Sequence, residues 1–406
     1  MKKYWLVLSP DTFIWLKGEN GLLYQSVNHT QVPFKNVGTI KSLAGQLDDI
    51  DNLYRVELTE EMLQQPEVNG WVRQIVDKQC GRLLENNGTG NRPASMKPVL
   101  KLQDGVKYYE WLHRQGIDGC VIQNLHEVVF YLNGSASGDD VLHRQLVYPS
   151  TTDAVADREK VIRFVKESKV SPFLSKLSLA GNLLVFPHLE EMAEELQAIC
   201  PVKLYITVED ALNGLPQLKE WADKLSVQIL VNDFPSLEML LDANGWCAGL
   251  QFTLVVTSVQ TYEAATGIIN KYGLEHVELV PAYTGENLPF FEDCIYPDAG
   301  ELAGVSLSKK DIFIRQTLNV TDFGKLYIEP DGKVYANLDN APLGMIDDSP
   351  HDLVYKELTE GHSWLHIRDQ EPCRECVYQW LCPSPSNYER VIGRPDLCKM
   401  AMGNEA

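Results

Sequence analysis

Six apolar runs in the middle of the chain, separated by amphipathic segments, constrain its fold more than any other feature. The runs are apolar almost throughout, which is typical of strands buried on both faces of a parallel sheet. They are "EVVFYL" (127–132), "KLSLAG" (176–181), "VKLYITV" (202–208), "SVQILV" (226–231), "GLQFTLVV" (249–256) and "HVELVP" (276–281). Intervening segments such as 157–168 and 188–199 carry apolar residues at i, i+3, i+4 and i+7, and they predict helices. This alternation predicts an α/β domain around a parallel sheet.

The number of strand–helix units indicates how that sheet closes. Six units are two fewer than the eight of a complete barrel, so we expect an open, partial (β/α)6 TIM-like barrel over residues 99–310. At 406 residues the chain is long enough for two or three domains. The regions on either side of the barrel are therefore expected to form units of their own.

Residues 1–84 predict a small N-terminal α+β domain, and residues 85–98 predict a linker because they are rich in Gly, Asn and Pro. The elements expected in the domain are three short strands within 12–34, a helix over 39–47, a strand over 53–58 and a helical stretch from the capping residue Thr59 to Cys80. The pattern changes again over residues 311–406. The stretch "FGKLYIEPDGKVYANL" predicts a β-hairpin with a Pro-Asp-Gly turn, and a helical segment follows at 352–360.

Charge and hydropathy exclude several classes of protein. No run of about 18 apolar residues is present, so we expect no membrane span. The N-terminal apolar patch is broken by Pro10, Asp11 and Lys17 and lacks a cleavage site, which disfavours a signal peptide. A net charge of −20 disfavours a nucleic-acid partner. Five of the nine cysteines occur singly, which is typical of a reducing compartment and predicts a cytoplasmic protein; they are residues 80, 120, 200, 247 and 294.

The other four cysteines form a block near the C-terminus with the spacing C-x2-C-x5-C-x15-C. These four C-terminal cysteines are Cys373, Cys376, Cys382 and Cys398. Two thiolates separated by two residues can grip one metal centre, and a set of four suits either a tetrahedral zinc ion or a [4Fe–4S] cluster. Spacing alone favours zinc. The alternative is four free surface thiols or disulfides.

The residues around this block resemble the SPASM domain, the auxiliary-cluster module of radical S-adenosylmethionine enzymes that mature peptides. The resemblance rests on C-x2-C-x5-C, the preceding "PDGKVY" hairpin and the following "LGMI". It implies that the four C-terminal cysteines ligate one auxiliary [4Fe–4S] cluster, with zinc as the alternative. The family's first auxiliary cluster should be absent, because Asn337 and Ser386 occupy two of its cysteine positions and no cysteine lies between residues 295 and 372.

The resemblance extends into the predicted barrel, where the catalytic features are missing. The stretch 177–196 is laid out like the family's "GGEP" motif, which meets the amino group of S-adenosylmethionine. Here the motif is replaced by Ala180, Gly181, Asn182 and Leu183. An ammonium group would lose its charged partner, and charge-assisted hydrogen bonds are roughly twice as strong as neutral ones. The family's C-x3-C-x2-C motif occurs nowhere, so no cleavable S-adenosylmethionine is expected.

These departures make the chain resemble the pseudo-rSAM proteins of bacterial peptide-modification systems of the GG-Bacteroidales type, which accompany an intact radical maturase. His143, Asp139 and Asp140 follow the first predicted barrel strand; they suggest a substitute metal site or, more simply, a solvated loop. The N-terminal unit looks somewhat like the small winged-helix domain that captures precursor leader peptides on an edge strand. The alternative is a plain appendage that packs on the barrel.

Two classes of function follow. The first is a non-enzymatic scaffold that binds a precursor peptide, an active radical maturase or both, with a heterodimer as one form of the complex with the maturase. Its cluster would stabilise the fold or, less simply, relay electrons. The second is an enzyme with a residual or repurposed site at the carboxyl ends of the barrel strands. Residues that would form this second site are Asn133, Asn182, Glu209, Asp210, Asn232, Asp233 and Tyr283. The missing motifs favour the scaffold over the enzyme.

Overall fold

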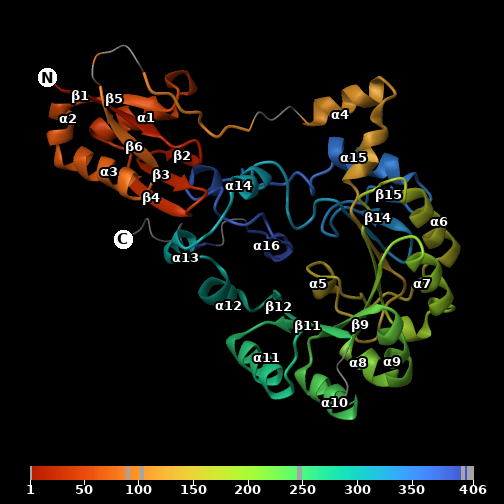
Figure 1. Ribbon diagram of the computed structural model, residues 1–406. Coiled ribbons are helices and arrows are strands. Elements are labelled where there is room, and N and C mark those ends of the chain that lie inside the picture. The colour runs from red at the N-terminus through yellow and green to blue at the C-terminus, as the bar shows by residue number, and fades with distance from the viewer. Residues whose placement is uncertain are drawn as a thin grey trace.

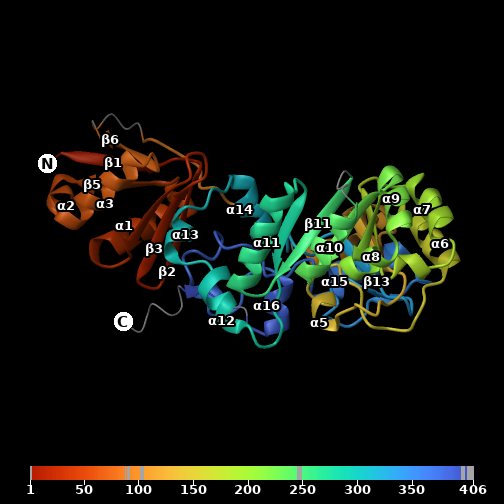
Figure 2. The same ribbon diagram turned by 90° about the horizontal axis from the view of Figure 1, so that it is seen from below.

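The computed structural model describes residues 2–86, 88, 92–100, 105–244, 249–394 and 398–399 (Figure 1). The N-terminal unit lies to one side of a larger body that contains the central sheet, and Figure 2 shows the same separation from below. Among the described residues, no helix is both long enough and apolar enough to cross a bilayer.

The N-terminal unit contains two small antiparallel sheets with strand orders β5-β1-β6 and β2-β3-β4. Its strands are β1 (Lys3–Leu8), β2 (Thr12–Lys17), β3 (Asn20–Gln25), β4 (Thr30–Lys35), β5 (Arg55–Thr59) and β6 (Gly81–Glu85). Its helices are α1 (Gly38–Asp48), η1 (Ile50–Asn52), α2 (Glu60–Gln64) and α3 (Pro66–Asp77). One face of each sheet joins α1 and α3 in a shared core. The three strands predicted within 12–34 are confirmed.

The helical stretch predicted from Thr59 to Cys80 is interrupted. Thr59 caps it as expected, since its side chain accepts a hydrogen bond from the amide of Met62. However, Gln65 is extended, because the proline that follows it disfavours the helical conformation, so α2 ends there and α3 begins at Pro66. The strand β6, which was not predicted, then pairs with β1.

The larger body is built on a nine-stranded sheet with the order β12-β11-β10-β9-β8-β7-β13-β14-β15. Six strands follow one another along the chain and pair in parallel: β7 (Glu127–Tyr131), β8 (Lys176–Ala180), β9 (Val202–Thr207), β10 (Ser226–Val231), β11 (Leu250–Val256) and β12 (Val277–Pro281). All six predicted barrel strands, and the parallel α/β class, are therefore confirmed. The outer strands of the sheet are β12 and β15, so it is open, as expected.

The predicted C-terminal hairpin is also confirmed, and it extends the central sheet. Its strands are β13 (Lys325–Ile328) and β14 (Lys333–Tyr335), followed by the short β15 (Gly344–Met345). The turn between the first two needs Gly332, whose φ is +86°. β13 pairs in parallel with β7, which joins a segment near the C-terminus to the first strand of the barrel.

The two faces of the sheet are covered differently. One face packs against helices that connect the parallel strands, in the main core of the protein. These helices are α6 (Arg158–Ser168), α7 (Leu189–Gln197), α8 (Val208–Asn213), α9 (Leu215–Lys224), α10 (Phe234–Asn244) and α11 (Val259–Tyr272). The other face carries Val129, Tyr131, Tyr205 and Tyr327, and the loop that follows β7 packs on it through Leu142 and Tyr148.

The remaining elements lie before the sheet and around its C-terminal end. They are α4 (Gly105–Arg114), η2 (Asp118–Asn124), α5 (Asp140–His143), η3 (Leu183–Val185), α12 (Leu288–Phe290), η4 (Phe291–Ile295), α13 (Ala299–Ala303), α14 (Lys309–Arg315), α15 (Pro350–Glu360), η5 (Cys373–Glu375) and α16 (Asn387–Ile392). α14 packs against the N-terminal sheet β2-β3-β4 and links it to the cysteine block.

Candidate functional site

The four C-terminal cysteines line one cavity of about 640 Å³, which we call the thiol cavity. In the described residues 361–386, between α15 and α16, the only helix or strand is the single turn η5, which carries Cys373. The amide of Cys376 donates to the carbonyl of Cys373 at 3.1 Å, and the amide of Cys382 donates to that of Tyr378 at 3.1 Å. Successive tight turns therefore bring three thiols from a short segment to one cavity.

The four thiols of the cavity are partly buried, and the cation Arg368 lies among them in the lining. Burial raises the pKa of Cys373 and of Cys376, and it raises that of Cys382 to about 12. Arg368 lowers the pKa of two of these thiols, Cys373 and Cys382. Its side chain is 11% exposed, and its guanidinium donates to both carboxylate oxygens of Glu389 at 2.9 and 3.0 Å. Arg368 was not singled out in the sequence, since nothing near it signals a role.

The chemistry of the thiol cavity fits a thiophilic metal centre. All four cysteines are free thiols, they face one space, and cysteine sulfur is the donor shared by structural zinc and iron–sulfur sites. Among the described residues, no group of three or more His, Cys, Asp or Glu side chains is arranged compactly enough to hold a metal ion. The donor set fits, and the residues that would hold the group are the four C-terminal cysteines.

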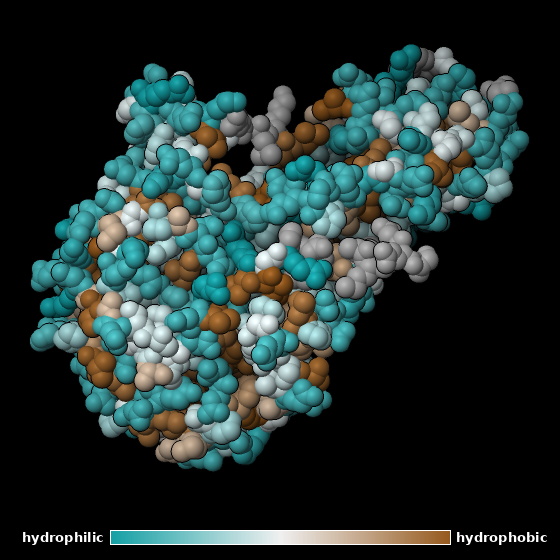
Figure 3. Space-filling model, turned by 180° about the vertical axis from the view of Figure 1, so that it is seen from behind, coloured by the Kyte–Doolittle hydropathy of each residue, from teal (hydrophilic) through white to brown (hydrophobic). Residues whose placement is uncertain are grey.

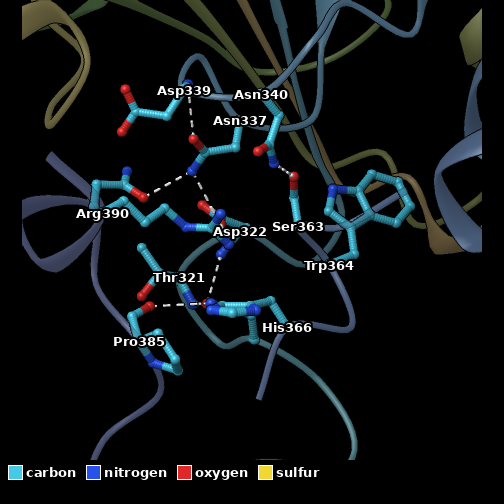
Figure 4. Close-up of polar contacts among 12 residues, drawn as sticks. Thr321, Asp322, Asn337, Asp339, Asn340, Ser363, Trp364, His366, Pro385 and Arg390 are labelled. Atoms are coloured by element: carbon cyan, nitrogen blue, oxygen red, sulfur yellow. Dashed lines mark hydrogen bonds and ion pairs between the residues drawn. The ribbon is translucent and has the colours of Figure 1, made fainter. Parts of the chain in front are cut away.

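The two positions expected to have lost cysteine ligands both make polar contacts. Asn337 is 1% exposed; its amide donates to Asp322 at 3.1 Å and to Asn387 at 2.9 Å, and its oxygen accepts from the amide of Asp339 at 3.0 Å (Figure 4). Ser386 caps α16, where its hydroxyl donates to a carboxylate oxygen of Glu389 at 3.0 Å. In both places a polar side chain is tied into the surrounding fold.

Asp322 and Arg390 form a buried ion pair beside Asn337. Figure 4 shows them facing each other, and the distance between Nη2 and Oδ2 is 3.4 Å. The carboxylate of Asp322 is fully buried, and its Oδ1 atom has no hydrogen-bond partner. Burial raises the pKa of Asp322 from 3.8 to about 6, although Arg390 and Asn337 lower it. Sequence reasoning missed this pair, because the two residues lie far apart in the chain.

The residues in place of the "GGEP" motif lie at the carboxyl end of β8. Gly181 has a φ of +138°, and a Cβ there would lie 2.3 Å from Oδ1 of Asn133, so only glycine fits. The amide of Asn133 donates to the backbone carbonyl of Asn182 at 2.9 Å and so ties the ends of β7 and β8 together. The side-chain oxygens of Asn133 and Asn182 are buried without hydrogen-bond partners. Ala180 and Leu183 are buried and apolar.

The other predicted strand-end residues also lie at this edge of the sheet, as parallel strands require. Asp210 accepts a hydrogen bond from Ser135 in the loop after β7, at 2.6 Å. Burial raises the pKa of Glu209, and Asp233 raises it further, which places these two acids near each other. Tyr283 is anchored separately, since its amide donates to the side chain of Gln145 at 2.8 Å. Asn232 lies directly after β10, and among the described residues its side chain has no hydrogen-bond or ion-pair partner.

The loop after β7 differs from the solvated loop suggested by its sequence. His143 is only 8% exposed and lies on the ring of Tyr131, with ring centroids 4.3 Å apart. One ring nitrogen contacts the carbonyl of Tyr148 at 2.6 Å and the other contacts a carboxylate oxygen of Glu329 at 2.6 Å. Burial lowers the pKa of His143, but Glu329 and Tyr148 raise it by more, so the net shift is upward. For His143, therefore, the solvated interpretation was wrong.

Asp139 and Asp140 also have local structural partners. Asp139 caps α5 by accepting from the amides of Val141 and Leu142. Asp140 accepts from the amide of Thr151 at 3.1 Å. Because all three residues of the suggested substitute metal site are engaged with protein groups, they contribute to holding the loop against the sheet.

The chain was compared with known proteins. No family model matches it, and no curated protein matches it. The solved structure of SuiB from Streptococcus suis has 12% identity and a TM-score of 0.44, and the alignment covers 97% of this chain and 99% of SuiB. SuiB bound to its precursor peptide SuiA gives 11% and 0.43, covering 98% and 100%. BtrN in an open conformation gives 11% and 0.26, covering 62% and 92%. At these identities and TM-scores, the similarities establish neither a family nor a function for this chain.

Proposed function

We propose that this chain is a pseudo-radical-S-adenosylmethionine protein of a peptide-maturation system, which binds a precursor peptide, an active maturase or both without catalysing radical chemistry. The observation that carries the proposal is the convergence of the four C-terminal cysteines on one cavity. Cysteines at the other family positions are absent, and the polar side chains there are engaged with the protein. The chain would thus keep one auxiliary metal centre and lack both the catalytic cluster and the first auxiliary cluster of the family.

A [4Fe–4S] cluster is the occupant that the thiol cavity favours over zinc. A zinc ion needs four sulfurs within about 2.3 Å of one point. A cubane binds each cysteine to a different iron atom, so its ligands are spread around a larger volume. The four thiols line a cavity of about 640 Å³, which has room for a cubane and so supports the cluster. With all four irons ligated by cysteine, the cluster would serve the fold or carry electrons.

The loop after β7 supports the non-catalytic part of the proposal. In the family that this chain resembles, the same loop supplies the cysteines that bind the catalytic cluster. Here the loop contains no cysteine, and its residues Leu142, His143 and Tyr148 are buried against one face of the sheet. The contact between His143 and Glu329 fixes it to β13 and the following turn. A loop packed in this way covers part of that face and leaves a cavity of about 290 Å³ between itself and the strands.

The face of the molecule that Figure 3 shows has no dominant apolar patch to which the proposed partner could bind. That face is mostly hydrophilic, with apolar residues in small scattered groups. Strand addition is compatible with such a surface, because backbone hydrogen bonds supply most of the affinity. The N-terminal unit offers edge strands in both of its small sheets. We therefore propose this unit as the place where a precursor peptide is captured.

A cleavage assay tests the non-catalytic function. Anaerobically purified protein is mixed with dithionite and S-adenosylmethionine, and 5′-deoxyadenosine is measured. We expect no product above a protein-free blank, since the chain lacks the three-cysteine motif that leaves an iron open. An intact radical maturase that carries the motif serves as the positive control. Formation of more than one product molecule per chain would refute the non-catalytic function.

A second candidate function is favoured by one observation. Side-chain oxygens of Asn133, Asn182 and Glu209 are buried at the carboxyl ends of neighbouring strands, and none of the three has a hydrogen-bond partner. Buried acceptors without partners are costly, so they commonly indicate a ligand or an ordered water. A residual site for a small hydrogen-bond donor at this edge is therefore the alternative to a purely scaffolding barrel.

A further inference from the structure

The thiol cavity is not formed by the C-terminal segment alone. Residues from the N-terminal unit line its other side, and they come from the start of β3 and the end of β4: Asn20, Gly21, Pro33, Phe34 and Lys35. These two stretches pair with each other, Asn20 with Lys35 and Gly21 with Phe34. The cavity therefore lies between two parts of the chain that are more than 300 residues apart.

The contact between the two parts is well packed beside the cavity. One face of the β2-β3-β4 sheet, with Phe13, Leu22 and Tyr24, packs against α14 and the buried Leu381, which lies next to Cys382. The hydroxyl of Tyr24 donates to the carbonyl of Leu307 at 2.9 Å and accepts from its amide at 2.6 Å. Such a buried contact fixes the end of the sheet against the cysteine block.

The charges around the cavity also indicate that the N-terminal unit belongs to the site. Four thiolates around a zinc ion or a cubane carry a net negative charge, so nearby cations stabilise them. Arg368 is already paired with Glu389, and Glu375 adds an acid to the lining. The N-terminal unit supplies Lys35 in the lining, and Lys17 lies close enough to Cys376 to interact with its thiol electrostatically. The N-terminal unit thus places two lysines beside the thiols in a chain with a net charge of −20, and Nζ of Lys35 donates to the side-chain oxygen of Asn20 at 3.1 Å.

We infer that the N-terminal sheet completes the metal centre: Asn20, Pro33 and Lys35 close the thiol cavity, so that metal binding and docking of the β2-β3-β4 sheet stabilise each other. This inference rests on the proposed metal centre. It extends the proposal because the N-terminal unit is the part expected to capture the peptide. Docking of its sheet would then depend on whether the metal centre is occupied. By linkage, docking of the sheet strengthens metal binding by the same factor by which the bound metal strengthens docking.

Hydrogen exchange on the full-length chain tests the inference directly. Zinc is added to metal-free protein, because a four-thiol site takes zinc whichever metal it holds natively. We expect zinc to slow amide exchange at least several-fold at Asn20, Gly21, Phe34 and Lys35, which line the cavity. The other N-terminal sheet, β5-β1-β6, does not line the cavity and is the internal control.

A charge-reversal variant supplies the second measurement. Lys35→Glu puts an acid on the cavity wall, and we expect it to speed zinc release to a chelator by about three- to tenfold. The effect should shrink at high salt, because the residue is exposed. The matched control is Lys41→Glu, an exposed lysine in α1 that does not line the cavity, and it should release zinc at the wild-type rate.

The outcomes separate this inference from the function on which it rests. Stoichiometric zinc uptake with unchanged exchange in β3 and β4, and wild-type release from Lys35→Glu, would overturn the coupling and leave the metal centre intact. A chain that takes up no zinc and also assembles no cluster when iron and sulfide are supplied without oxygen would remove the metal centre and, with it, the coupling. Slowed exchange together with faster release from the Lys35 variant supports the inference.

Discussion

A Cys376→Ala chain is expected to purify without stoichiometric metal and with a disordered C-terminal segment, while the central sheet stays folded. The reason is that residues 361–386 contain only one turn of helix, so most of their order must come from side-chain packing and from the metal centre. Metal binding to a structural four-ligand site contributes folding free energy, about 10–16 kcal/mol for zinc in small domains. Losing one ligand of four removes most of that contribution.

Limited proteolysis with mass spectrometry, beside metal analysis, measures this result. Cleavage should appear within 366–386, and the fragment containing β7 to β12 should resist as in wild type. Cys294→Ala is the matched control, because Cys294 is an exposed free thiol outside the thiol cavity. A Cys376→Ala chain that keeps wild-type metal content would show that this cysteine is not a ligand. One that loses metal but stays fully folded would favour electron relay over a structural role.

Removal of Arg390 is expected to produce the second large effect, and its size should depend on pH. Arg390→Met leaves the carboxylate of Asp322 buried without its charged partner, and breaking a buried ion pair costs about 3–5 kcal/mol. The folded-state pKa of Asp322, about 6, already lies above its ordinary 3.8, and losing Arg390 raises it further. A carboxylic acid with a raised pKa loses stability as pH rises from the unfolded to the folded pKa. The variant should therefore be close to wild type near pH 4 and most destabilised above pH 7.

Denaturant unfolding at several pH values between 4 and 8 measures this difference. The matched control is Arg114→Met, since Arg114 is 69% exposed, its ion pair with Glu110 is 3.8 Å long, and its Nε donates to the backbone carbonyl of the same residue at 3.2 Å. It should change the unfolding free energy by less than about 0.5 kcal/mol at every pH. A pH-independent loss in Arg390→Met would mean that packing, and not the charge of Asp322, accounts for its role. No loss at any pH would show that the network in Figure 4 does not hold the C-terminal region together.

The sequence predicted the parts of this fold whose signals are local. The six parallel strands are apolar almost throughout, and the Pro-Asp-Gly turn fixes the hairpin of β13 and β14. It did not predict that β13 pairs with β7, because pairing between remote strands leaves no local pattern. The strand β6 was missed because it is short and begins directly after the turn that ends α3.

In the candidate site, too, local features could be predicted from the sequence and contacts between distant residues could not. Spacing alone was enough to group the four C-terminal cysteines, since three of them lie on consecutive tight turns. The burial of His143 could not be foreseen, because its partner Glu329 lies 186 residues further along the chain. The same holds for Lys35, which lines the thiol cavity from the N-terminal unit. Residues that meet only through tertiary structure are those for which sequence reasoning failed.

The central claim is that a chain without radical chemistry keeps one cluster on the four C-terminal cysteines. Iron, sulfide and zinc analysis of anaerobically purified protein tests this claim most directly, with the ultraviolet–visible spectrum recorded on the same sample. The account predicts about four iron and four sulfide per chain in the wild type, and none in Cys376→Ala. About one zinc without iron would contradict the cluster, and a wild-type chain free of both metals would contradict the metal centre itself.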